Sequence, residues 1–246
     1  MTKPRLRNAR RRKVGAGGRI IRLLWQGFAL VVLVTILYSA WLWVDMRSWQ
    51  PAEEAYPEQG AAIRSGVAAT RFETLRALGA QFVYLELAPS GAEPDPGFPA
   101  RLAAAREAGL KVGLVFPFDL CTRADPQSAR FTRMVPRDAD FLPPALSLRI
   151  GRIPCTPPMS DAAVESELMT LINQVEMHAG RPVILKVGPA FEQKYRIAGR
   201  IERNLWLIRD RAEPDYAGRP WLLWSANGGL MTEASEDPVE WVVVQK

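Results

Sequence analysis

Residues 99–116 read Pro-Ala-Arg-Leu-Ala-Ala-Ala-Arg-Glu-Ala-Gly-Leu-Lys-Val-Gly-Leu-Val-Phe and contain one complete helix-to-strand unit. Pro99 suits the first turn of a helix over Pro99–Ala108, because a first-turn residue needs no N–H donor. Gly109 suits the end of that helix, where the backbone often turns left-handed. Lys111–Phe116 is then an apolar run of strand length. This unit predicts an α/β protein.

The same alternation extends in both directions along the chain. Further apolar runs of strand length occur at Phe82–Ala88, Ala145–Ile150, Val183–Val187, Leu205–Arg209, Trp221–Ser225 and Trp241–Gln245. Further helical stretches are predicted at Arg71–Leu78, Pro126–Val135, Asp161–Ala179 and Ala190–Ala198. Alternating strands and helices favour a parallel sheet, closed as a barrel or doubly wound. The dipeptide Gly228-Gly229 is interpreted as a turn.

The charge is distributed unevenly along the 246 residues. The chain has 32 Lys and Arg against 26 Asp and Glu, a formal net charge of +6. Nine of the basic residues lie at or before Arg22, and no acid precedes Asp45. The remainder is mildly acidic, so we predict no nucleic-acid partner. One histidine excludes sites built from two histidine ligands, and two cysteines exclude a four-cysteine zinc site. We therefore expect no metal and no cofactor.

The first 50 residues predict a membrane anchor. Leu23–Val44 contains 22 residues without a charge, and roughly 20 apolar residues span a bilayer core. A cleaved signal peptide is the alternative, but its apolar region is usually ~7–15 residues long. The basic residues place the N-terminus in the cytoplasm. We predict a basic tail over 1–22, a transmembrane helix over 23–44, a linker over 45–59, and a body over 60–246 that is periplasmic or extracellular.

The order of segments in the body resembles the lysozymes of glycoside hydrolase family 25. The matching segments are Tyr56-Pro57-Glu58-Gln59-Gly60, Phe82-Val83-Tyr84-Leu85, Asp95-Pro96-Gly97-Phe98, Ala108-Gly109-Leu110-Lys111-Val112-Gly113, Val135-Pro136-Arg137-Asp138-Ala139-Asp140, Leu142-Pro143-Pro144, Gly180-Arg181-Pro182-Val183, Leu205-Trp206 and Trp221-Leu222-Leu223-Trp224. Their order and spacing, rather than any single segment, carry the resemblance. It implies an irregular, TIM-like (β/α)5β3 barrel whose substrate groove lies at the C-terminal ends of the strands.

The acids that the resemblance implies are mostly absent. The family's Asp-x-Glu pair aligns with Ser147 and Arg149, its early Asp with Ala62, and its late Asp with Glu240. A glycosidase needs two carboxylates across the scissile bond, and arginine cannot serve as a general acid because it stays protonated. We therefore expect a catalytically impaired relative.

Other carboxylates are candidates for the missing roles. Glu86 and Asp119 lie at or after strand ends and, with Glu240, are the possible substitute acids. The alternative is that Glu86 pairs with an arginine such as Arg149, and that Asp119 is a loop or cap residue. Phe118, Trp224 and Asn227 are candidate glycan-binding residues; the alternative is that the aromatic side chains belong to the core and Asn227 to a turn.

Cys121 and Cys155 follow the ends of two neighbouring predicted strands. Outside the cytoplasmic membrane two thiols are expected to be oxidised, and the family resemblance supports a Cys121–Cys155 disulfide. Two buried free thiols are the alternative.

Three functions remain open at this point. In the first, the body binds peptidoglycan, or a protein partner in the cell envelope, without cleaving glycan. In the second, it is an active peptidoglycan hydrolase that uses displaced carboxylates. In the third, it is a structural partner with no affinity for glycan.

Overall fold

The computed structural model describes residues 16–67, 69–137, 140–151 and 155–246, with side chains from residue 21. The chain divides into two compact units, one ending at Asp45 and one spanning Met46–Lys246. The predicted Val135–Asp140 segment lies partly outside the described residues, as does most of the basic tail.

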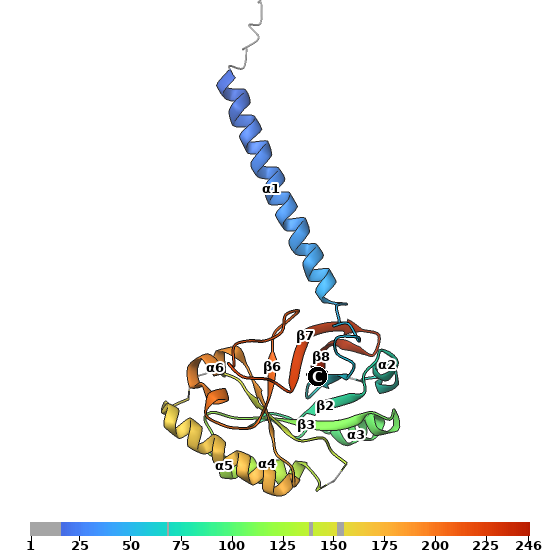
Figure 1. Cartoon of the computed structure of the whole chain (residues 1–246), viewed down its shortest axis with the longest axis vertical. Helices are drawn as coiled ribbons and strands as arrows, with labels where there is room; N and C mark the ends of the chain where they lie inside the picture. Colours follow the sequence, from blue (N-terminus) through green and yellow to red (C-terminus); the bar gives the residue numbers. More distant parts are fainter. Residues whose placement is uncertain (1–15, 68, 138–139, 152–154) are drawn as a thin grey trace, which may run out of the picture. The chain divides into compact units, whose positions relative to one another are not determined.

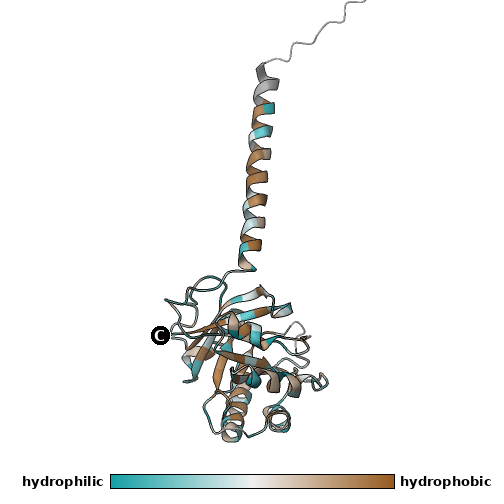
Figure 2. Cartoon of the chain, turned by 90° about the vertical axis from the view of Figure 1, so that its right-hand side faces the viewer, coloured by the Kyte–Doolittle hydropathy of each residue, from teal (hydrophilic) through white to brown (hydrophobic). Residues whose placement is uncertain are grey.

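The first unit is built around α1 (Ala16–Met46). Within the described part of the chain, one helix is long and apolar enough to cross a membrane, and it covers Ile21–Met46. Figure 2 shows hydrophobic residues along most of its length. The predicted span Leu23–Val44 lies inside this helix.

The second unit is a closed barrel of eight strands in sequence order (Figure 1). The strands are β1 (Gln59–Ile63), β2 (Phe82–Glu86), β3 (Lys111–Pro117), β4 (Ala145–Leu148), β5 (Ile184–Val187), β6 (Asn204–Ile208), β7 (Leu223–Thr232) and β8 (Ser235–Val244). The helices between them are α2 (Phe72–Ala77), α3 (Phe98–Glu107), α4 (Ala124–Met134), α5 (Asp161–Ala179) and α6 (Pro189–Tyr195), with a short 3-10 helix, η1, at Ile197–Gly199.

Strands β1 to β7 run parallel, and β8 is antiparallel to both β7 and β1. A helix follows each of the first five strands, so the predicted (β/α)5β3 barrel is confirmed and the doubly wound alternative is excluded.

Two separate clusters of buried side chains stabilise the body. One contains strand residues such as Ala62, Tyr84 and Trp206 and no helical residue, so it fills the barrel interior. The other lies between the strands and the helices. The buried face of α5 belongs to this outer cluster, as its 3–4 residue spacing predicts. Ser160 caps the N-terminus of α5, and Gly180 ends it with φ 65°.

Two expectations about the strands were incomplete or wrong. β1 was not predicted, because its sequence has small residues and only one β-branched side chain. The Gly228-Gly229 turn is wrong, because both residues lie within β7. There the register with β8 shifts on either side of Asn227, which leaves the Gly228 N–H to donate to Asp210 Oδ1 at 2.8 Å. The chain reverses between Thr232 and Ser235 instead.

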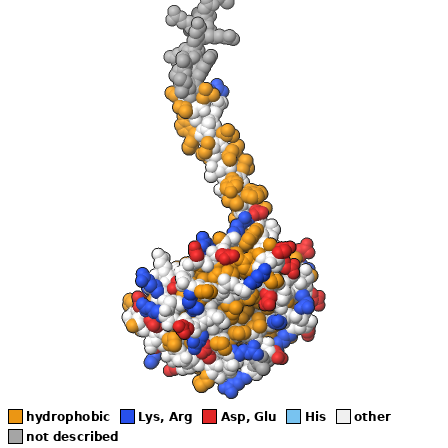
Figure 3. Space-filling model, viewed as in Figure 1, with side chains coloured by type: hydrophobic (Ala, Val, Ile, Leu, Met, Phe, Trp, Pro, Cys, Tyr) orange, Lys and Arg blue, Asp and Glu red, His pale blue; other side chains and the backbone are white. Residues whose placement is uncertain are grey.

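The surface of the body carries charges of both signs. On the face shown in Figure 3, Lys and Arg side chains are interspersed with Asp and Glu. No extended basic surface is visible on that face.

Candidate functional site

The polar residues of the barrel interior gather at the C-terminal ends of the parallel strands. Ser147 and Lys186 each lie one residue before the end of their strand and are register partners across β4 and β5. Glu240 on β8 is paired with Ala62 near the end of β1. Because side chains alternate along a strand, these residues point into the same end of the barrel. Three of the four positions aligned with family acids are therefore brought to this mouth.

A buried ion pair joins Lys186 and Glu240 inside the barrel. The Lys186 Nζ lies 2.6 Å from Glu240 Oε1, and the two side chains are 1% and 10% exposed. The ammonium also lies 4.1 Å from the centre of the Trp206 ring. A lysine held this way neutralises the one carboxylate that remains at a family acid position.

The same carboxylate belongs to a chain of hydrogen bonds. The Ser225 hydroxyl donates to Glu240 Oε1, and Trp206 Nε1 donates to Ser225 Oγ at 2.7 Å. Tyr84 packs edge-on against Trp206, with ring centroids 4.9 Å apart. These contacts fix Glu240 in one orientation and give the Ser225 hydroxyl and the Trp206 N–H hydrogen-bond partners inside the barrel.

The environment of Glu240 favours its ionised form. Burial by itself would raise the pKa of Glu240, but the charge and hydrogen bond of Lys186, the Ser225 hydroxyl and the charge of Arg149 together hold it below its ordinary value. A general acid must carry a proton at working pH. Glu240 is therefore suited to a structural or electrostatic role and unsuited to proton donation.

The pKa of Glu86, at the end of β2, is shifted in the opposite direction. Burial raises the pKa of Glu86, and the negative charge of Glu240 raises it further, against the lowering effects of Lys186, Arg149 and Arg64. The expectation that Glu86 faces the barrel interior agrees with this set of neighbours.

The hypothesis of a direct Glu86–Arg149 ion pair does not hold among the described residues. None of their ion pairs within 4.0 Å joins these two side chains. Arg149 follows the last residue of β4 and is exposed. The charge of Arg149 acts on Glu86 and Glu240 through space and lowers the pKa of both carboxyls.

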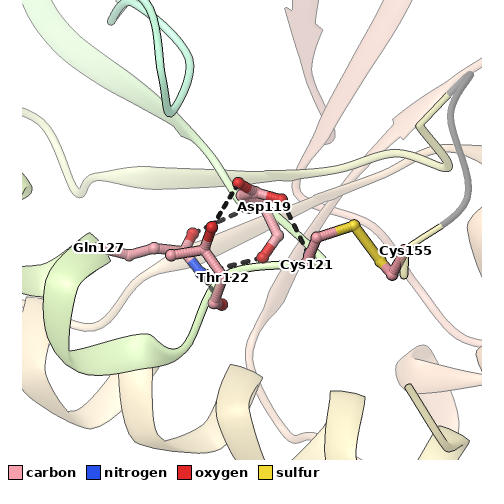
Figure 4. The surroundings of a disulfide bond; sticks show 5 residues. All are labelled: Asp119, Cys121, Thr122, Gln127 and Cys155. Carbon is pink, nitrogen blue, oxygen red and sulfur yellow. Dashed lines mark hydrogen bonds between the residues drawn. A yellow bond between two sulfur atoms is a disulfide. The ribbon is translucent and has the colours of Figure 1, made fainter. Parts of the chain in front are cut away.

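Asp119 makes local contacts after β3 (Figure 4). Its carboxylate accepts hydrogen bonds from the Cys121 N–H at 2.9 Å and the Thr122 hydroxyl at 2.7 Å. The backbone of Asp119 is held by the Gln127 side chain. These contacts describe a loop-capping residue, the alternative weighed for this position, and they occupy both carboxylate oxygens.

The predicted Cys121–Cys155 disulfide is present, with Cα atoms 5.2 Å apart. It ties the loop after β3 to the segment after β4. Beside it opens a cleft of about 1120 Å³, here called the mouth cleft. Its lining includes Phe118, Asp119, Arg149, Thr156, Lys194 and Tyr195.

The three candidate glycan-binding residues differ in their surroundings. Phe118 lines the mouth cleft but is largely buried. Trp224 is 2% exposed, packs against Tyr56, and donates its Nε1–H to the Arg209 carbonyl at 2.7 Å. Asn227 is buried, with its amide nitrogen donating to the Trp49 carbonyl and its oxygen accepting from Gly229. Of the three, Phe118 lines the mouth cleft, whereas Trp224 and Asn227 are buried and held by internal hydrogen bonds.

Lys186 is the site residue that the sequence interpretation missed. The signal was a single lysine inside the apolar run Val183–Val187. A charged residue flanked by apolar ones in a central strand is rarely buried without a partner. Within the described residues, no group of three His, Cys, Asp or Glu side chains is placed to hold a metal ion.

Comparison with known proteins gives the same architecture. No family model matches the sequence, and no curated protein matches it. Solved structures do match. A family 25 glycosyl hydrolase from Bacillus anthracis superposes with a TM-score of 0.72 at 20% identity, covering 80% of this chain and 92% of that one. This chain has the fold of the family 25 lysozymes.

Two further structures with this lysozyme fold extend the comparison. The lysozyme from Streptomyces coelicolor matches with a TM-score of 0.67 at 14% identity, over 77% of this chain and 92% of that one. The spore cortex lytic enzyme SleM from Clostridium perfringens matches with a TM-score of 0.66 at 17% identity, over 79% of this chain and 69% of that one.

Proposed function

We propose that this chain is a membrane-anchored domain of lysozyme fold that binds peptidoglycan, or a partner in the cell envelope, without cleaving glycan. The Lys186–Glu240 ion pair is the observation that carries the proposal. It places a buried cation where the mouth of a glycosidase barrel needs carboxylates.

The charges at the mouth oppose glycoside hydrolysis. The transition state of this reaction gains positive charge on the sugar ring. Lys186 and Arg149 would both destabilise that charge, and Ser147 supplies no carboxylate. Glu240 keeps a negative charge, but Lys186 compensates it at 2.6 Å. Binding of a sugar does not require a general acid, so the replacement of these acids does not by itself remove it.

The location of the body is part of the proposal. We propose that α1 remains as an anchor with the N-terminus in the cytoplasm and the body in the periplasm or outside the cell. The basic residues up to Arg22 support this orientation. The Cys121–Cys155 disulfide supports an oxidising compartment for the body.

Sedimentation with insoluble peptidoglycan tests the binding. The full chain in detergent micelles is incubated with purified sacculi and centrifuged. We expect it in the pellet, and we expect it in the supernatant when sacculi are replaced by cellulose. Equal recovery in the supernatant with both materials would contradict glycan binding and leave an envelope protein as the partner.

An active hydrolase is the second candidate, and the opposite pKa shifts of Glu86 and Glu240 favour it. A carboxyl with a raised pKa beside one with a lowered pKa is the arrangement of an acid and a base. Strands β2 and β8 both flank β1, so their axes lie about 9–10 Å apart. Carboxylates on such strands can approach the ~5–9.5 Å that glycosidases use.

The two candidates differ in one measurable product. Hydrolysis through Glu86 releases new reducing ends from peptidoglycan, and Glu86→Gln abolishes them. The non-catalytic proposal expects the wild-type chain and the Glu86→Gln variant to release equal, background amounts.

A further inference from the structure

The segment that precedes β1 is held against the body at several points. The Pro51 and Tyr56 carbonyls both accept hydrogen bonds from the Gln59 side chain, at 3.1 and 2.8 Å. Pro51 is buried, and the Tyr56 ring packs edge-on against Trp224, with ring centroids 5.5 Å apart. Residues 46–58, which form most of the predicted linker, are therefore attached to the barrel and are here called the strap.

The strap begins at Met46, the first residue of the second unit. The side-chain amide of Asn227, on β7, donates to the Met46 carbonyl and, at 2.9 Å, to the Trp49 carbonyl. The Met231 N–H, also on β7, donates to the Arg47 carbonyl at 2.7 Å. Three hydrogen bonds therefore hold the first four residues of the body against the second half of β7.

This attachment lies at the mouth end of the barrel. Ser225 is the register partner of Ile208, the last residue of β6. Asn227 comes two residues later on β7, so it lies beyond the C-terminal end of β6. The chain that leaves α1 therefore joins the body beside the mouth and not at the opposite end of the barrel.

The chain between the apolar span and this attachment is short. Val44 is the last apolar residue before Asp45, and Met46 follows Val44 by two positions, or about 3 Å at the helical rise per residue. The headgroup layer on each side of a bilayer core is about 5–7 Å thick. If Val44 ends the membrane-spanning part, Met46 lies within this layer, and its hydrogen bond brings Asn227 to the same depth.

The side chains around the attachment are of the kinds found at a membrane interface. Met231 is 37% exposed, Arg47 is exposed and Trp49 is half-buried. The Arg211 guanidinium lies 5.7 Å from the centre of the Trp49 ring. Tryptophan is enriched at the level of the lipid headgroups, and arginine is suited to contacts with phosphate.

We propose that the surface formed by Arg47, Trp49, Arg211 and residues 227–231 lies against the phospholipid headgroups of the membrane that anchors the chain. The proposal rests on the proposed membrane anchor and adds that the body does not swing freely on it. The mouth then opens beside the bilayer, so a ligand of the candidate site is met close to the membrane surface.

A fluorophore at position 231 tests the contact with lipid. Cys121 and Cys155 form the disulfide and leave no free cysteine, so Met231→Cys introduces a single reactive thiol for labelling with bimane. The labelled full chain is reconstituted into phosphatidylcholine vesicles, with or without a lipid that carries a nitroxide quencher on its headgroup. We expect the nitroxide lipid to remove most of the fluorescence. Met177→Cys, at an exposed position on α5, is the matched control and is expected to keep its fluorescence.

A flexible insertion separates a fixed surface from tethering alone. About 20 Gly and Ser residues placed between Asp45 and Met46 add roughly 25 Å of reach, and they leave the contacts between the strap and β7 intact. Because the body then moves away from the bilayer with its strap, quenching at position 231 should fall to the level measured at position 177.

The outcomes separate this inference from the function on which it rests. Equal, weak quenching at positions 231 and 177 in the uninterrupted chain overturns the inference, as does quenching at 231 that survives the insertion. In both cases a chain that stays in the vesicles after alkaline extraction keeps its anchor. A chain that alkaline extraction releases overturns the anchor and the inference together.

Discussion

Replacing Lys186 by methionine removes the cation of the buried ion pair and keeps a side chain of similar length. Glu240 then remains in the barrel interior with only the Ser225 hydrogen bond and distant charges to stabilise its ionised form. Removing one partner of a buried ion pair typically costs about 3–5 kcal/mol. A domain of this size is stable by about 5–15 kcal/mol, so the loss is a large fraction of the total.

The pH dependence of this loss follows from the direction of the Glu240 pKa. In the wild-type chain the folded pKa lies below the unfolded one, so the contribution of Glu240 is present at neutral pH and lost as pH falls through the folded value. In Lys186→Met, burial is no longer opposed by the adjacent cation, and the pKa of Glu240 rises above its unfolded value. The difference in stability between the two proteins should therefore shrink from pH 7 to pH 4.

Urea unfolding of residues 46–246, followed by tryptophan fluorescence, measures this effect. Trp206 lies beside the substituted position and reports on the barrel interior. The double variant Lys186→Met/Glu240→Gln is the control, because it removes both charges and keeps an acceptor for Ser225. We expect it to recover most of the loss. A loss below about 1 kcal/mol at pH 7, or an equal loss at both pH values, would refute the reasoning.

Three further predictions concern other parts of the chain. Reduction of Cys121–Cys155, or its replacement by two serines, should lower the free energy of unfolding by about 3–4 kcal/mol, because it closes a loop with a sequence separation of 34; an unchanged urea midpoint would contradict this. The hydrogen bond from Arg101 is the main cause that lowers the pKa of Asp95 to about 2, so Asp95→Asn should cost about 1–2 kcal/mol at pH 7 and little near pH 2; a loss independent of pH would exclude this origin. A C-terminal alkaline phosphatase fusion should be active in bacteria if the body is outside the cytoplasm, whereas an inactive fusion of normal abundance would reverse the predicted orientation.

Local signals in the sequence were sufficient for much of the fold. The helix predicted over Asp161–Ala179 has those ends in the structure, because Ser160 and Gly180 are strong cap residues. Strand β1 was not predicted because Gln59–Ile63 has little β-propensity of its own. Its strand conformation is stabilised by pairing with β2 and β8. This strand is specified by tertiary contacts.

The candidate site was harder to predict than the fold. The order of segments was enough to align Ser147 and Arg149 with family acids. It gave no indication that Glu240 pairs with Lys186. Lys186 lies 54 residues before Glu240 in the chain, and only closure of the barrel brings β5 and β8 to the same interior.

The release of reducing ends from peptidoglycan tests the central claim most directly. The full chain is incubated at high concentration with borohydride-reduced sacculi, beside an active lysozyme and the variants Glu86→Gln and Glu240→Gln. The account predicts the same background signal for the wild-type chain and both variants, while the wild-type chain sediments with the sacculi. Reducing ends that accumulate with time and disappear in either variant would contradict it.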